Sequence, residues 1–191
     1  EVATNCQQVL GGHGYIAEWG MEQFVRDARI AMIYEGTNGI QALDLVGRKL
    51  GAKGGRGTQA WLALVGSDLA AAAADDRLAF LTGPLGKALA DVQAGIMWLL
   101  QNGMTNPDNA GAGATAFMRM LGHVALGHMW LKMAMASQAA LDAGTSDPDF
   151  HTAKLITARY FAARVLPETA SLRAQLEAGA EVVMALPEAM F

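Results

Sequence analysis

The sequence has few of the features that mark exported, membrane-spanning or nucleic-acid-binding proteins. A single cysteine, Cys6, occurs among 191 residues, so no internal disulfide can form, and this usage suits a reducing cytoplasm. Only 17% of the residues are charged, and a net charge of −4 provides no basic footprint for nucleic acid. No apolar run reaches the roughly 20 residues of a membrane-spanning helix. We therefore expect a cytoplasmic protein with no membrane span and no nucleic-acid partner.

The sequence also lacks the alternation of polar and apolar residues that a half-buried strand needs, and nearly every segment has helical spacing instead. With 52% hydrophobic residues, the chain can bury one substantial core or two small ones. The predicted fold class is all-α. Residues 21–34 and 39–50 are predicted helices, and in the second of these Ile40, Leu43 and Val46 form the face expected to be buried.

A cluster of glycines interrupts the helical pattern at residues 51–57, where four of seven residues are glycine. We place a linker here, between a first region at 1–50 and an added helical bundle at 58–191. Four long helices joined by short loops are predicted in the bundle, so an antiparallel packing is expected. Their ranges are 58–74, about 84–102, 110–143 and 149 to about 178, the last one bent near Pro167.

Two of the bundle helices carry very little charge: residues 92–106 have none, and 110–140 contain only Arg119 and Lys132. Helices that are apolar on most sides are covered on several sides. The cover is either an ordinary core in which methionine fills irregular gaps or a second subunit, and the sequence favours the two equally. His123 and His128 are five residues apart, which does not fit two ligands on one helix face, so no metal site is expected.

Three motifs near the beginning of the chain carry the chemistry. The first is a glycine-rich bend, Gln8-Val9-Leu10-Gly11-Gly12-His13-Gly14-Tyr15. The second is the helical run that contains Arg26-Asp27-Ala28-Arg29. The third is Ile33-Tyr34-Glu35-Gly36-Thr37-Asn38-Gly39-Ile40-Gln41, which sets one carboxylate beside a glycine directly before a new helix. On residue type alone, Glu35 could simply complement the dipole of that helix.

In this order and spacing the three motifs resemble the carboxy-terminal helical domain of the acyl-CoA dehydrogenase family, over about the first fifty residues, a limit set by the glycine helix-end signals. The continuation Ala42-Leu43-Asp44-Leu45-Val46-Gly47-Arg48-Lys49-Leu50, followed by a long helical extension, looks most like the subgroup that includes 3-methylmercaptopropionyl-CoA dehydrogenase. The chain is too short for a complete enzyme of that family and begins Glu1-Val2-Ala3 without an initiating Met, so we expect a fragment that is inactive alone.

The resemblance implies the α,β-desaturation of an acyl-CoA thioester by FAD. Glu35 would be the base that removes the α-proton, a task that suits a carboxylate whose pKa is raised by apolar surroundings. Gly36 would let the thioester approach the backbone closely. Thr37 and Asn38 would hydrogen-bond FAD, although Gly39 stands where some family members have a longer polar side chain.

The same resemblance implies that Gln8, Gly11 and Gly12 reach the adenosine-diphosphate part of the FAD of a neighbouring subunit, and hence a homo-oligomer, either a dimer or a tetramer. Electron-transfer flavoprotein would be the electron acceptor. Two alternatives stay open: an acyl-CoA oxidase that passes electrons to oxygen, and a non-catalytic helical module used for assembly. A DNA-associated flavoprotein of the same superfamily is disfavoured by the acidic balance.

Overall fold

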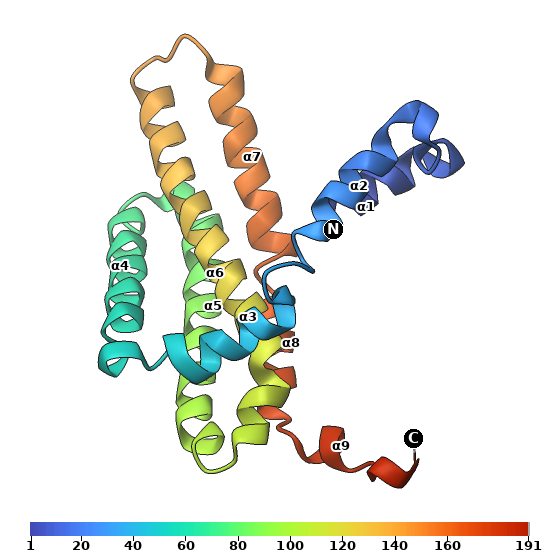
Figure 1. Cartoon of the computed structure of the whole chain (residues 1–191). Coiled ribbons are helices and arrows are strands. Elements are labelled where there is room, and N and C mark those ends of the chain that lie inside the picture. The colour runs from blue at the N-terminus through green and yellow to red at the C-terminus, as the bar shows by residue number, and fades with distance from the viewer. Residues whose placement is uncertain (191) are drawn as a thin grey trace. The chain divides into compact units, whose positions relative to one another are not determined.

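The computed structural model describes residues 1–190, and within that range every regular element is a helix (Figure 1). The all-α prediction is confirmed. The chain divides into two compact units, residues Glu1–Gln41 and the residues from Ala42 onward. None of the helices within residues 1–190 combines the length and apolar character needed to cross a membrane.

The first unit consists of two antiparallel helices joined by a bend. α1 (Val2–Val9) leads into the short turns η1 (Gly11–Gly14) and η2 (Ala17–Trp19), and α2 (Met21–Ile30) runs back along α1. At the bend, a Cβ on Gly14 would lie 2.5 Å from the carbonyl oxygen of Gln7, so the chain can close here only on glycine. The Gln7 side chain fixes the bend by donating from Nε2 to the Gly14 carbonyl at 3.3 Å.

The two helices predicted in this region differ from the observed ones at their ends. α2 stops at Ile30 rather than Tyr34, and α3 (Thr37–Asp44) continues as the π-helical turn η3 (Leu45–Lys49). The predicted burial of Ile40 and Leu43 was wrong, because their side chains are 54% and 47% exposed. Helical periodicity identifies an apolar face but not the surface that covers it. In this stretch Ala42 is the fully buried residue.

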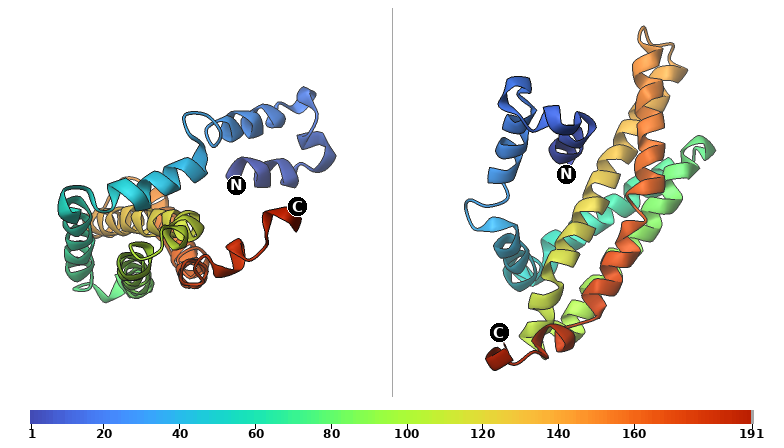
Figure 2. Two further views of the ribbon diagram at one scale, coloured as in Figure 1. Left: turned by 60° about the horizontal axis from the view of Figure 1, so that its bottom comes forward. Right: turned by 90° about the vertical axis from the view of Figure 1, so that its right-hand side faces the viewer.

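The second unit is an antiparallel helical bundle built around its longest helix, α6 (Figures 1 and 2). The chain enters through η4 (Ala52–Gly55) and continues as α4 (Arg56–Ala72), η5 (Asp76–Leu78), α5 (Ala79–Trp98), η6 (Leu99–Gly103), α6 (Pro107–Asp142), α7 (Pro148–Arg164), α8 (Glu168–Glu177), α9 (Glu181–Met184) and η7 (Glu188–Met190). α5, α7 and α8 pack along α6, and α4 packs against both α5 and α6.

The predicted bend near Pro167 is a complete break. α7 ends at Arg164 and α8 begins at Glu168, so the predicted fourth helix is two helices lying along α6. Proline lacks the N–H that would continue the helix. The break is closed by local bonds, in which Glu168 and Thr169 donate to the carbonyls of Val165 and Leu166, both at 3.1 Å.

The core of the bundle includes one face of α6. Phe117, Val124, His128 and Leu131 are buried, whereas Leu121 and Met135 are only partly buried. His128 has a polar partner in the core, since its Nε2 lies 2.6 Å from Oδ2 of Asp68 on α4. This contact holds the pKa of the Asp68 carboxyl below its usual value.

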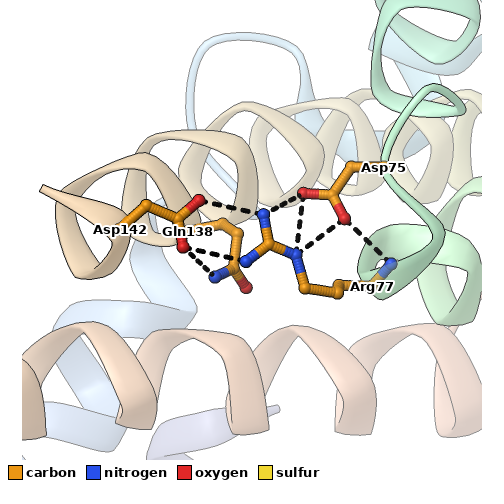
Figure 3. Close-up of polar contacts among 4 residues, drawn as sticks. All are labelled: Asp75, Arg77, Gln138 and Asp142. Carbon is orange, nitrogen blue, oxygen red and sulfur yellow. Dashed lines mark hydrogen bonds and ion pairs between the residues drawn. The ribbon is translucent and has the colours of Figure 1, made fainter.

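An ion-pair clamp links the segment between α4 and α5 to the end of α6 (Figure 3). Arg77 donates to Asp75 and, through Nη1 at 2.8 Å and Nη2 at 2.9 Å, to both carboxylate oxygens of Asp142 at the end of α6. Gln138 donates to the same Asp142 carboxylate at 3.2 Å. Arg77 therefore lowers the pKa of both aspartates, and they raise the pKa of Arg77.

The glycine-rich segment 51–57 is a folded turn that leads directly into α4. Lys53, Gly54 and Gly55 all have left-handed backbone, with φ of 53°, 68° and 74°. Thr58 donates from Oγ1 to the Leu50 carbonyl at 3.2 Å and ties the turn to the preceding helix. The two compact units meet at Gln41 and Ala42, before this turn. The three-part division at 1–50, 51–57 and 58–191 stays a prediction, and residue 191 lies outside the described residues.

Candidate functional site

The turn that contains Glu35 has an unusual backbone. Glu35, Gly36 and Thr37 are successive left-handed residues, with φ of 53°, 95° and 47°. Glycine accepts this conformation readily, but for a residue such as Glu35 or Thr37 it costs about 1–3 kcal/mol. Two hydrogen bonds hold the turn: Asn38 N donates to the Met32 carbonyl, and Gln41 Nε2 donates to the Glu35 carbonyl, both at 3.2 Å. These bonds fix the backbone from which the Glu35 side chain extends.

The Glu35 carboxylate is uncommitted within the described part of the chain. Its side chain is exposed and forms no ion pair or hydrogen bond among residues 1–190. The neighbouring Ile33 and Tyr34 are 47% and 55% exposed, so residues 1–41 do not by themselves supply the apolar enclosure that a carboxylate base requires. Glu35 lies directly before α3, whose N-terminal N–H groups favour a nearby negative charge.

The residues after Glu35 leave hydrogen-bonding groups available for a cofactor. Thr37 Oγ1 accepts from Ile40 N at 3.3 Å, which caps α3 and leaves the hydroxyl hydrogen to donate elsewhere. The amide of Asn38 is exposed and makes no side-chain hydrogen bond within residues 1–190. These groups fit the polar edge of a flavin, which presents both donors and acceptors.

The second predicted cofactor contact lies at the bend after α1. The side chain of Gln8 is exposed, Gly11 has a left-handed φ of 58°, and a Cβ built on Gly11 or Gly12 would meet no atom within 4 Å. The backbone of the bend is thus open to close approach, as binding of a phosphate by backbone N–H groups requires. Uncovered glycine backbone fits a diphosphate.

The first unit does not bring these two turns together. The bend with Gln8, Gly11 and Gly12 precedes α2 and the Glu35 turn follows it (Figure 1). α2 has 10 residues, and a helix of that length spans about 15 Å. Glu35, Gly36, Thr37 and Asn38 form one cluster, and Gln8, Gly11 and Gly12 form another.

Comparison with known proteins decides the family. A family model described as "Acetyl-CoA dehydrogenase C-terminal like" matches residues 61–187, and one described as "Acyl-CoA dehydrogenase, C-terminal domain" matches residues 1–50. The chain belongs to the acyl-CoA dehydrogenase family. The resemblance seen in the three motifs is therefore confirmed, and it extends into the bundle, for which no motif had been recognised.

Three relatives of this acyl-CoA dehydrogenase region show how far the similarity reaches. The chain is 40% identical over 172 residues to 3-methylmercaptopropionyl-CoA dehydrogenase of Ruegeria pomeroyi, and the match covers 88% of the chain and 29% of that protein. It is 32% identical over 196 residues to the broad-specificity linear acyl-CoA dehydrogenase FadE5 of Mycobacterium tuberculosis, covering 98% of the chain and 32% of that protein.

A butyryl-CoA dehydrogenase of Syntrophomonas wolfei is 29% identical over 184 residues, which cover 95% of the chain and 30% of that protein. The chain thus spans less than a third of the length of each of these relatives.

Sequence reasoning missed one residue of the Glu35 turn. Gln41 belongs to the third motif, but nothing in its spacing from Glu35 indicated that its side chain turns back six residues to hold the Glu35 carbonyl. Helix contacts are expected at i+3 and i+4. The signal would have been a conserved amide after the turn, which a single sequence does not reveal.

Proposed function

We propose that the protein containing this region is a flavin-dependent acyl-CoA dehydrogenase that desaturates an acyl-CoA thioester between its α- and β-carbons. The observation that carries the proposal is an uncommitted carboxylate, Glu35, on a strained turn within the family motif. Strained backbone is concentrated at functional sites, where the surrounding structure maintains it. Glu35 removes the α-proton, and FAD, when bound, accepts the hydride that leaves the β-carbon.

The residues around Glu35 orient the reactants. Gly36, with φ of 95° and no side chain, leaves room for the thioester beside the carboxylate. Thr37 and Asn38 hold FAD through the hydroxyl and amide that the fold leaves free. Position matters because a base must lie within hydrogen-bond reach of the proton that it takes.

From the family match at residues 1–50, we also propose that Gln8, Gly11 and Gly12 bind the adenosine-diphosphate part of FAD in a neighbouring subunit. The protein is then a homo-oligomer, a dimer or a tetramer. We further propose electron-transfer flavoprotein as the acceptor and the cytoplasm as the compartment. The relatives, which are named as dehydrogenases, do not favour the acyl-CoA oxidase or the assembly module, and oxygen consumption during turnover would reveal an oxidase.

The first experiment measures bleaching of FAD by a panel of acyl-CoA esters, in the full-length protein and in its Glu35→Gln variant. Loss of the base is expected to slow bleaching by about 10²–10⁴-fold. Glu18→Gln, which changes an exposed glutamate in η2, is the control and should bleach at the wild-type rate. If Glu35→Gln bleaches as fast as Glu18→Gln, Glu35 is not the base. If neither variant nor the wild-type protein bleaches although all hold FAD and bind esters, the dehydrogenase proposal fails.

A complementation experiment tests the inter-subunit arrangement. Glu35→Gln and Gly12→Asp subunits are inactive separately, the second because a carboxylate repels a diphosphate. Mixed dimers contain one site with an intact Glu35 and an intact Gly12 from its neighbour, so random mixing should restore about a quarter of wild-type activity. If both residues serve one site from the same subunit, mixing restores nothing.

A further inference from the structure

The second unit contains an apolar hollow that the proposed reaction does not use. Its volume is about 640 Å³, within the roughly 300–1,000 Å³ range of small-molecule sites. Its walls come from the end of α3, from η3 and the turn after it, from the first turn of α4, from the end of α5 with η6 and the residue after it, and from the first turns of α6. All of its lining residues follow Ala42, so the hollow belongs to the bundle unit alone.

Two of the segments that line the hollow depart from the regular α-helix. η3 (Leu45–Lys49) and η6 (Leu99–Gly103) are π-helical turns, a feature that is rare and often found at functional sites. Six lining residues are glycine, so much of the wall is backbone without side chains. The remaining wall is mainly aliphatic, with Val46, Leu50, Ile96 and Leu99 among its residues.

No lining residue is charged, but the surrounding charges are biased. Within two positions of a lining residue there are four cations and two carboxylates: Asp44, Arg48, Lys49, Lys53, Arg56 and Asp108. This local excess of positive charge contrasts with the net charge of −4 of the whole chain. Asp44 already pairs with Arg48 and Lys49, at 2.6 and 3.1 Å. Lys53 and Arg56 form no ion pair within residues 1–190 and flank the lining glycines Gly54 and Gly55.

An aliphatic hollow whose lining glycines are followed or preceded in the chain by cations without an ion pair in residues 1–190 matches one class of ligand. We propose that it binds the hydrocarbon chain of an amphiphile with an anionic head, such as a fatty acid, and that Lys53 and Arg56 receive the head group. The apolar chain is removed from water in the hollow, while the head remains at the surface where its charge is solvated and paired. None of the lining residues belongs to the Glu35 turn, and the proposal does not depend on the proposed reaction.

Displacement of a fluorescent fatty acid by dodecanoate from the 191-residue chain tests the proposal. Exposed apolar residues elsewhere in the chain can also take up such a probe, so matched variants are required. Leu100 lines the hollow and Leu64 does not, yet both are 49% exposed. Leu100→Glu should weaken binding at least about tenfold, and Leu64→Glu should leave it unchanged.

A second pair tests the hollow without adding charge. Gly111 lines it, and a Cβ there would lie 3.9 Å from Leu43 Cδ2, so Gly111→Phe extends a ring into the space with little strain on the fold. Gly122→Phe is its control, because Gly122 lies on the same helix and a Cβ there would meet no atom within 4 Å. Gly111→Phe should weaken dodecanoate binding, and Gly122→Phe should not. Circular dichroism verifies that both variants remain helical.

The head-group contact has its own test. The double variant Lys53→Gln/Arg56→Gln should weaken the binding of dodecanoate about three- to tenfold and leave the binding of dodecanol unchanged. The control variant Lys87→Gln should change the affinity for neither ligand. Dodecanoyl-CoA, compared with dodecanoate, shows whether the carboxylate or the thioester is the better ligand, and displacement by either supports the site. Absence of saturable binding, or equal losses in Leu100→Glu and Leu64→Glu, would overturn the proposal and leave the hollow as a contact surface for another polypeptide segment.

Discussion

The tightest helix contact in the bundle gives a prediction whose size can be worked out. Gly113 on α6 lies against Leu176 on α8, which is fully buried. A Cβ on Gly113 would collide with the Leu176 side chain and lie 3.4 Å from its Cα. Gly113→Ala should therefore add an overpacking cost of about 1–3 kcal/mol, partly offset by up to about 1 kcal/mol of helix propensity. Leu176→Ala should cost about 2–5 kcal/mol, because it leaves a cavity.

The double variant is the decisive one. With Leu176 shortened, the methyl group introduced by Gly113→Ala enters vacated space, so the two changes together should cost about 1–3 kcal/mol less than their sum. Urea denaturation followed by far-ultraviolet circular dichroism measures the free energy of unfolding of the four proteins. Gly122→Ala is the control, since its Cβ meets no atom within 4 Å and should stabilise α6. Additive costs, or a Gly113→Ala variant as stable as Gly122→Ala, would refute the contact.

Two further predictions concern the ion-pair clamp and the catalytic turn. Arg77 lowers the pKa of Asp75 and Asp142 in the folded protein. The ion pairs therefore stabilise the fold above the ordinary aspartate pKa of about 3.9, and this stabilisation is lost as the pH falls through the lowered folded-state pKa values. Arg77→Gln should therefore unfold more easily than wild type at neutral pH, and the difference should disappear in acid; Lys87→Gln, measured in the same urea series, should show no such difference. In the full-length protein, Gly36→Ala should add about 1–2 kcal/mol of backbone strain and slow flavin bleaching, because φ at Gly36 is 95°. Gly66→Ala, inside α4 without a positive φ and with no atom within 4 Å of its Cβ, is its control, and equal loss in both variants would contradict a specific role for Gly36.

The existence of the helices could be predicted from the sequence, and their ends less accurately. The long helices predicted in the bundle are present, the last of them as the two helices α7 and α8, because apolar periodicity and turn residues act locally. Asn106 caps α6 by accepting from Asp108 N, and Asp147 caps α7 by accepting from Phe150 N, both at 3.1 Å. As a result α6 begins a few residues before its predicted start, and α7 begins one residue before. Pro84 was expected near a helix start, yet it lies inside α5, which begins at Ala79.

The residues of the candidate site could be named from their motifs, but their geometry could not. Nothing in the composition of Glu35 or Thr37 indicates a left-handed backbone, because glutamate and threonine normally avoid it. The hollow in the bundle was equally invisible, since Val46, Leu99 and Gly111 lie on three segments that only tertiary packing brings together. Long-range contacts of this kind leave no mark in local periodicity.

The two units differ in how much of their apolar surface they cover themselves. Before Ala42 the buried residue is Gly14, while Tyr15, Phe24 and Ile40 are 78%, 65% and 54% exposed. The bundle, in contrast, encloses a continuous core from Leu62 to Leu176. Its folding can therefore rest on its own hydrophobic burial, whereas the first unit needs another surface against its apolar face. The strained Glu35 turn lies in the unit that depends on such cover, so the burial that would make its carboxylate a base has to come from the surface that completes the unit.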